Sequence, residues 1–216
     1  MDNGNVEKGP PLHDVDIKAM FNPQLLAGAG ITVLAYAGSF ALYTYISPIL
    51  LQVTHVDERT SSLLMLGYGV MAAIGNIWGG RLTDKHGADY AVMTILIGLA
   101  IILFAMWLSI SSLILMALLI GLLGALTYAA VPSMQARVIG LSHIYAPEAP
   151  AVAAGLNIAG FNGGIALGSL LVGVALDSKG LTSPTWVGGG IVAVGILWML
   201  LQINSKKRRP TSDYSS

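Results

Sequence analysis

The chain has 216 residues, of which 55% are hydrophobic and 10% are charged, and its mean hydropathy is +0.72. Soluble globular domains carry about 25% charged residues, so this composition argues against a soluble protein. A formal net charge of zero gives no indication of nucleic-acid binding, and the absence of cysteine excludes disulfides and thiolate metal sites from this sequence. The charges lie in short zones between long apolar runs, which predicts an all-α integral membrane protein surrounded by lipid.

The N-terminal 22 residues form a polar segment. They carry six charges of both signs and include Pro10 and Pro11. A cleaved signal peptide has a basic start followed by an apolar core, and this segment has neither. Residues 1–22 are therefore predicted to be a cytoplasmic segment that precedes the first membrane span.

The first spans follow from the length of the apolar runs. A bilayer core of about 30 Å needs about 20 apolar residues in a helix. Pro23 is suited to the start of the first span, and Pro48 is suited to its end or to a kink. A second span is expected to end before a charged loop at residues 81–90.

The next 46 residues, 91–136, contain no charge. A single helix of that length would measure about 69 Å, so two spans with a turn at residues 107–112 are predicted. The second of them is expected to end at Pro132, before a loop at residues 133–150. The six predicted spans are 24–50, 61–80, 90–107, 112–132, 151–176 and 185–204 within a transmembrane domain at 23–205, and a basic tail follows at 206–216.

The distribution of basic residues predicts the orientation. The two ends of the chain and the loops at 81–90 and 133–150 hold nine of the 11 lysines and arginines, whereas the opposite loops hold only Arg59 and Lys179. Because positively charged loops stay in the cytoplasm, both termini are predicted to be cytoplasmic.

A polar stripe runs along the first span. Thr32, Tyr36, Ser39, Tyr43 and Ser47 are spaced by three or four residues, which places them on one helical face. A polar face on a membrane helix should contact protein or water, and tyrosines are suited to a sugar or an aromatic drug. Alternatively, the hydroxyls bond back to their own helix and the tyrosines pack between helices.

Three asparagines lie within predicted spans, and each needs a hydrogen-bond partner in a dry setting. Asn76, beside a pair of glycines, is interpreted as structural. Asn157 and Asn162 either line a pathway or join helices. They are about 140° apart around their helix, so they are not expected to point straight at one cavity. Tyr128 is a weaker pathway candidate.

The fifth span also carries Gly160, Gly164 and Gly168 at intervals of four residues. This pattern of small residues predicts close packing against another helix.

A glycine-rich charged loop follows the second span. Paired glycines allow helices to approach closely, and Asp84 could bond to the amides that start the next helix or pair with a basic side chain. Such a loop could latch two helices together, although an ordinary positively charged turn with a helix cap explains it too. The residues of this candidate gating loop are Gly80, Arg81, Asp84, Lys85 and Gly87.

The string Gly80-x-Leu82-x-Asp84-Lys85-x-Gly87 resembles the loop motif of the major facilitator superfamily, G-x-L-x-D-[RK]-x-G-[RK], with Ala88 in place of the last basic residue. Stretches at 42–48, 74–80 and 157–168 resemble the sugar-efflux and drug-efflux branch, and the arabinose-efflux-type permeases of the bacterial inner membrane most of all. The resemblance covers roughly residues 20–205. With it, the pathway candidates are Tyr36, Ser39, Tyr43, Tyr128, Asn157, Phe161 and Asn162.

Members of this family have twelve spans in two halves, and this chain resembles the C-terminal half, a bundle of three plus three helices. The resemblance implies efflux of a sugar or small drug-like molecule across the plasma membrane (the bacterial inner membrane), with an N-terminal six-helix half or a second copy as partner. The alternative is a non-transporting remnant or a partner-binding membrane scaffold.

No acidic, basic or histidine residue falls within a predicted span. The chain is therefore expected to hold no proton carrier, which a missing half would have to supply. The sequence also offers no metal-ligand cluster and no Ser-His-acid set, so no enzyme activity, cofactor or metal is expected.

Overall fold

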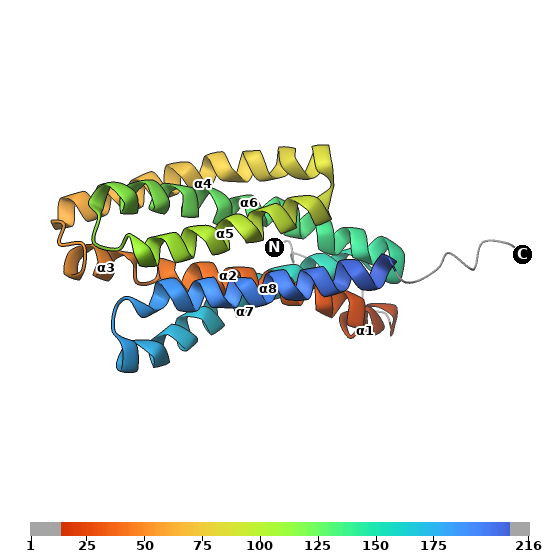
Figure 1. Cartoon of the computed structure of the whole chain (residues 1–216). Coiled ribbons are helices and arrows are strands. Elements are labelled where there is room, and N and C mark those ends of the chain that lie inside the picture. Colours follow the sequence, from red (N-terminus) through yellow and green to blue (C-terminus); the bar gives the residue numbers. More distant parts are fainter. Residues whose placement is uncertain (1–13, 208–216) are drawn as a thin grey trace, which may run out of the picture.

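The computed structural model describes residues 14–207, and all regular elements in that range are α-helices (Figure 1). Their bounds are α1 Asp14–Met20, α2 Pro23–Tyr43, α3 Ile46–Gln52, α4 Glu58–His86, α5 Ala88–Leu108, α6 Leu113–Tyr145, α7 Pro150–Lys179 and α8 Ser183–Lys207.

These helices are able to cross a bilayer six times. The stretch covered by α2 and α3 and each of α4 to α8 is long and apolar enough to span a bilayer, which confirms six membrane-spanning helices. Successive crossings run in opposite directions, so α1, the junction of α4 with α5, and the end of α8 gather at one end of the bundle (Figure 1). The assignment of residues 1–22 and 206–216 to the cytoplasm stays a prediction, and most of these residues lie outside the described range.

The first crossing is interrupted near Pro48. The helix breaks at Thr44 and Tyr45, in the turn before this proline, which agrees with the kink predicted there, and Pro48 itself is the third residue of α3. The amides of a first helical turn have no partner within the helix, so proline costs no hydrogen bond there. At the other end of the crossing, the Asn22 side chain caps α2 by accepting from the amide of Gln24 at 2.9 Å.

The loop predicted at 81–90 is almost entirely helical. Helix α4 continues to His86 and α5 begins at Ala88, so Gly87 alone separates them. Gly87 has a φ of 84°, a conformation that glycine adopts without the steric cost of a Cβ. Arg81, Asp84 and Lys85 therefore lie on the end of the long helix α4, and Asp89 lies in the first turn of α5.

The prediction that α6 ends at Pro132, with a loop at 133–150, is wrong, because the helix continues to Tyr145. Proline removes the hydrogen bond to the carbonyl four residues earlier, here that of Tyr128. The Asn76 side chain of α4 donates to that carbonyl at 3.5 Å and supplies a partner for it. This contact agrees with the structural role predicted for Asn76.

Glycine contacts hold α2 against α7. A Cβ built on Gly160 would lie 2.9 Å from the carbonyl oxygen of Ala29, and one on Gly164 would lie 2.6 Å from that of Val33. Gly168 faces the carbonyl of Ala37 even more closely. The close packing predicted for the three glycines is confirmed. Gly75 and Gly79 of α4 meet the backbone of α6 at Ala125 and Ala129 in the same way.

These contacts predict a specific sensitivity to one added methyl group. In Gly168→Ala the new Cβ would overlap the Ala37 backbone, so α2 and α7 must separate, and overpacking of this kind costs about 1–3 kcal/mol. The melting temperature in detergent should fall by several degrees. Gly173→Ala on the same helix is the control, since no atom lies within 4 Å of that Cβ and its melting temperature should stay unchanged.

Candidate functional site

Two adjoining cavities open among α2, α4, α6 and α7. Each measures about 420 Å³, and they share Asn76 and Tyr128. The first, here called the amide cavity, is lined by Tyr36, Asn76, Tyr128, Val131, Gln135, Asn157, Ile158, Phe161 and Asn162. The second, here called the tyrosine cavity, is lined by Tyr43, Met65, Tyr68, Gly69, Ala72, Ala73, Asn76 and Tyr128.

The two cavities follow one another along the bundle. Met65 of the tyrosine cavity lies in the third turn of α4, at the end of the bundle that holds α3. Asn157 of the amide cavity lies in the third turn of α7, which begins at the opposite end (Figure 1). Since Asn76 and Tyr128 line both, the two cavities adjoin each other along the helices.

An aromatic cluster connects the two cavities. The rings of Tyr36 and Phe161 meet edge to face at 4.4 Å between centroids. The Tyr43 ring lies 4.9 Å from that of Tyr68, which in turn lies 6.3 Å from Tyr128. Rings in these arrangements pack favourably with each other and offer flat apolar surface to a ligand.

Three polar side chains from three helices are joined at the amide cavity. The Thr32 hydroxyl of α2 donates to Asn157 Oδ1 of α7 at 2.7 Å, and Asn157 Nδ2 donates to Gln135 Oε1 of α6 at 2.6 Å. Thr32 and Asn157 are buried, whereas Gln135 is partly exposed. Asn157 therefore both joins helices and lines the cavity.

Asn157 and Asn162 both line the amide cavity, although they are about 140° apart around α7 and were not expected to point straight at one cavity. The cavity is wide enough to follow the whole arc of α7 between them, with Phe161 and Ile158 at intermediate angles. The asparagines lie at the two edges of that arc.

Six of the seven predicted pathway residues line one of the two cavities, and Ser39 lines neither. The Ser39 hydroxyl is buried and donates to the carbonyl of Ala35 at 2.9 Å, so the alternative of a hydroxyl bonded back to its own helix applies here. Ser47, also on the predicted stripe, lies 3.3 Å from the hydroxyl of Ser61. In this stripe the tyrosines Tyr36 and Tyr43 line the cavities, whereas the serine hydroxyls bond to other groups of the protein.

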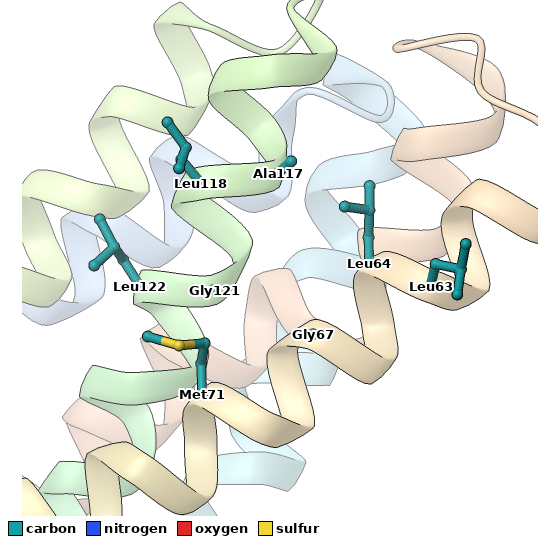
Figure 2. A pocket seen from close by; sticks show the side chains of 8 residues that line it. All are labelled: Leu63, Leu64, Gly67, Met71, Ala117, Leu118, Gly121 and Leu122. Carbon is teal, nitrogen blue, oxygen red and sulfur yellow. The ribbon is translucent and has the colours of Figure 1, made fainter.

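A third hollow, of about 400 Å³, lies between α4 and α6 (Figure 2). Figure 2 shows only apolar side chains around it, among them Leu64, Met71 and Leu122, with Gly67 and Gly121 leaving the space. It offers no side-chain hydrogen bond, so the amide and tyrosine cavities are the better candidates for a specific site.

The candidate gating residues lie at the end of α4. The side chains of Arg81, Asp84 and Lys85 are exposed, and a Cβ on Gly80 would meet nothing within 4 Å. Within residues 14–207, Asp84 makes neither the helix cap nor the ion pair that the sequence suggested. The ion pair of this region belongs to Asp89, in the first turn of α5.

Arg137, expected in a loop, is instead a buried residue of α6 in the part of the helix that extends beyond the predicted span. Its Nε donates to Asp89 Oδ1 at 2.8 Å and its Nη2 to Gln202 Oε1 of α8 at 2.8 Å. Gln202 Nε2 donates in turn to the carbonyl of Ala27 in α2. A buried guanidinium thus ties four helices together at the end of the bundle that holds the α4–α5 junction.

The sequence reasoning missed Gln135 and Tyr68 as cavity residues. Gln135 could have been found, because Tyr128, Val131 and Gln135 are spaced by three and four residues and share a helical face. The interpretation of Pro132 as a helix end places Gln135 in a loop, so this shared helical face is not recognised from the sequence. No group of three potential metal ligands occurs among the described residues.

Comparison with known proteins identifies the family of this bundle. A family model described as Major Facilitator Superfamily matches residues 28–214. The chain belongs to the Major Facilitator Superfamily. This membership agrees with the resemblance carried by the loop motif at residues 80–87.

Individual relatives match most of this chain, and the match covers slightly less than half of each relative. The chain is 38% identical to the uncharacterized MFS-type transporter YtbD of Bacillus subtilis (84% of this chain, 46% of the relative) and 33% identical to the inner membrane transport protein YdhP of Escherichia coli K12 (91% and 49%). It is 27% identical to a chloramphenicol resistance protein of Streptomyces lividans (88% and 47%). The chain thus spans about half the length of the relatives it matches.

The Arg137 network predicts unequal roles for two nearby aspartates. In Asp89→Asn the buried guanidinium loses its carboxylate. Because Asp89 is 43% exposed, the expected destabilisation is about 1–2 kcal/mol, less than for a fully buried pair. The melting temperature in detergent should fall by several degrees. Asp84→Asn is the control and should leave it unchanged. Equal melting temperatures for the two variants would contradict the role assigned to the pair.

Proposed function

We propose that this chain is the C-terminal half of an efflux permease of the Major Facilitator Superfamily, and that it exports a sugar or a small drug-like molecule. The observation that carries the proposal is the adjoining pair of cavities lined by amides and aromatic rings within a largely apolar bundle. Hydroxyl groups of a ligand can bond to the amides, and apolar faces can pack on the rings. Transport by positioned binding groups, without catalysis, is the activity that this lining supports.

The face that carries the cavities needs a cover. In the apolar stretches of α4 and α7 only 22% of residues are buried, against 67% in the first crossing. Asn76 and Asn162 are exposed on this face, and lipid offers no hydrogen bonds to an amide. We propose that an N-terminal six-helix half covers it, as the double length of the relatives supports, and that substrate passes between the halves.

We further propose a bacterial inner-membrane location with both termini in the cytoplasm. The E. coli relative is named an inner membrane protein, and nine of 11 basic residues lie on the side of the termini. In this orientation the candidate gating residues and the Arg137 network face the cytoplasm. The Arg137 network would hold the cytoplasmic ends of α2, α5, α6 and α8 in one arrangement and release them in another.

Export can be tested by pairing the chain with the N-terminal half of YtbD in bacterial cells that lack their own drug exporters. Accumulation of radiolabelled chloramphenicol or L-arabinose should fall only when both halves are present. Phe161→Ala should reduce export about threefold or more, since it removes the ring packed on Tyr36. Phe104→Ala, on α5 and outside both cavities, is the matched control.

Unchanged accumulation of both compounds with every partner half tested would contradict export. The alternative, a non-transporting scaffold, is motivated by the half-length of the chain. If no export is found, a stable complex with a membrane partner in native gel electrophoresis would support the scaffold alternative.

Orientation can be measured directly, because the chain has no cysteine. Ser178→Cys, near the end of α7, should react in intact cells with a maleimide that does not cross membranes. Ser205→Cys, near the end of α8, should react only after the cells are permeabilised. The reverse pattern would show that the termini lie outside the cytoplasm.

A further inference from the structure

The hydrogen bonds around the amide cavity run from Thr32 through Asn157 to Gln135. The Thr32 hydroxyl donates to Asn157, which makes Asn157 Oδ1 an acceptor and turns its nitrogen toward Gln135. Gln135 therefore accepts through Oε1, and its Nε2 group has no partner in the described part of the chain. Because Thr32 and Asn157 are 1% and 6% exposed, water hardly competes for this chain of bonds. The amide cavity thus contains an oriented N–H donor at Gln135.

The other two amides of the cavity are oriented the opposite way. Asn76 Nδ2 donates to the carbonyl of Tyr128 at 3.5 Å, and Asn162 Nδ2 donates to that of Ile158 at 3.0 Å. Their Oδ1 oxygens remain as acceptors, unpartnered within residues 14–207. The cavity therefore combines the N–H group of Gln135 with two amide acceptor oxygens and the Tyr128 hydroxyl, which can donate and accept, while Phe161 and Tyr36 provide an aromatic wall.

The described residues that line the two cavities include no ionised side chain. A ligand carboxylate or ammonium would therefore find hydrogen-bonding groups in this lining but no counter-ion. Burying an unpaired charge is far more costly than burying a hydroxyl that finds a partner. A hydroxyl is suited to this lining because it both donates and accepts.

We propose that the amide cavity selects an uncharged ligand that carries hydroxyl groups beside an aromatic or other flat apolar group, and that Gln135 is the residue that determines this specificity. The inference rests on the proposed export function and names its substrate class. Thr32 and Asn157 act as positioning residues, since they fix which end of the Gln135 amide faces the ligand. Chloramphenicol, an uncharged aryl diol with an amide, has this chemistry and serves as the probe.

The test uses the full chain paired with the N-terminal half of YtbD in proteoliposomes, with chloramphenicol and the cationic aromatic dye ethidium as probes. Gln135→Glu is almost isosteric and still accepts from Asn157, but it replaces the donor with a charged acceptor. It should raise the KM for chloramphenicol about threefold to tenfold and shift the preference toward ethidium. Thr32→Val frees the Asn157 amide to rotate, so it should raise the same KM with little change in maximal rate.

Gln52→Glu, at an exposed position outside both cavities, is the matched control for Gln135→Glu. If the wild-type pair transports chloramphenicol but the Gln135→Glu variant keeps the wild-type ratio of chloramphenicol to ethidium, the specificity role is overturned while export stands. If the wild-type pair moves no probe, the export function fails and the inference fails with it. A changed ratio in Gln135→Glu with wild-type behaviour in Gln52→Glu supports the inference.

Discussion

The contact of glycine residues with backbone carbonyls is the constraint on which the rest of the bundle depends. In a bilayer, apolar side chains gain little free energy when they move from lipid into a contact between helices. Helices therefore associate through close packing and hydrogen bonds. Gly160, Gly164 and Gly168 let α7 reach the carbonyl surface of α2, and Gly75 and Gly79 let α4 reach α6. The cavities exist because these two tight pairs are held beside each other, with larger residues such as Tyr128 and Phe161 lining the space between them.

Polar groups occur in this bundle where a backbone or a buried charge needs them. Asn76 bonds to a carbonyl that Pro132 leaves without a partner, and Gln202 bonds both to Arg137 and to the carbonyl of Ala27. Asn157 combines this structural function with a place in the cavity wall. A single amide in a membrane helix can therefore stabilise the fold and contact a ligand, because both tasks use different atoms of the same group.

The sequence predicted the number of spans well, because the physical requirement for a span is a long charge-free run. It placed six of seven pathway residues around the cavities, since the spacing of Tyr36 and Tyr43 follows the helical period. It failed where tertiary contacts overrule a local signal. Proline ordinarily ends helices, yet Asn76, 56 residues earlier in the chain, satisfies the carbonyl that Pro132 exposes. Likewise, the partners of Arg137 lie 48 and 65 residues away, so no local pattern could predict them.

Gly87 has a mechanical consequence for the motion of α4 and α5. With one residue between them, these helices are hinged at their ends and cannot slide apart there. Relative movement is confined to a change of angle, which grows with distance from the pivot. Helix α5, at 21 residues, is about 32 Å long, so a rotation of about 10° displaces its far end by about 5 Å. Small adjustments at the charged end of the bundle are thereby amplified into large ones at the end that holds α3.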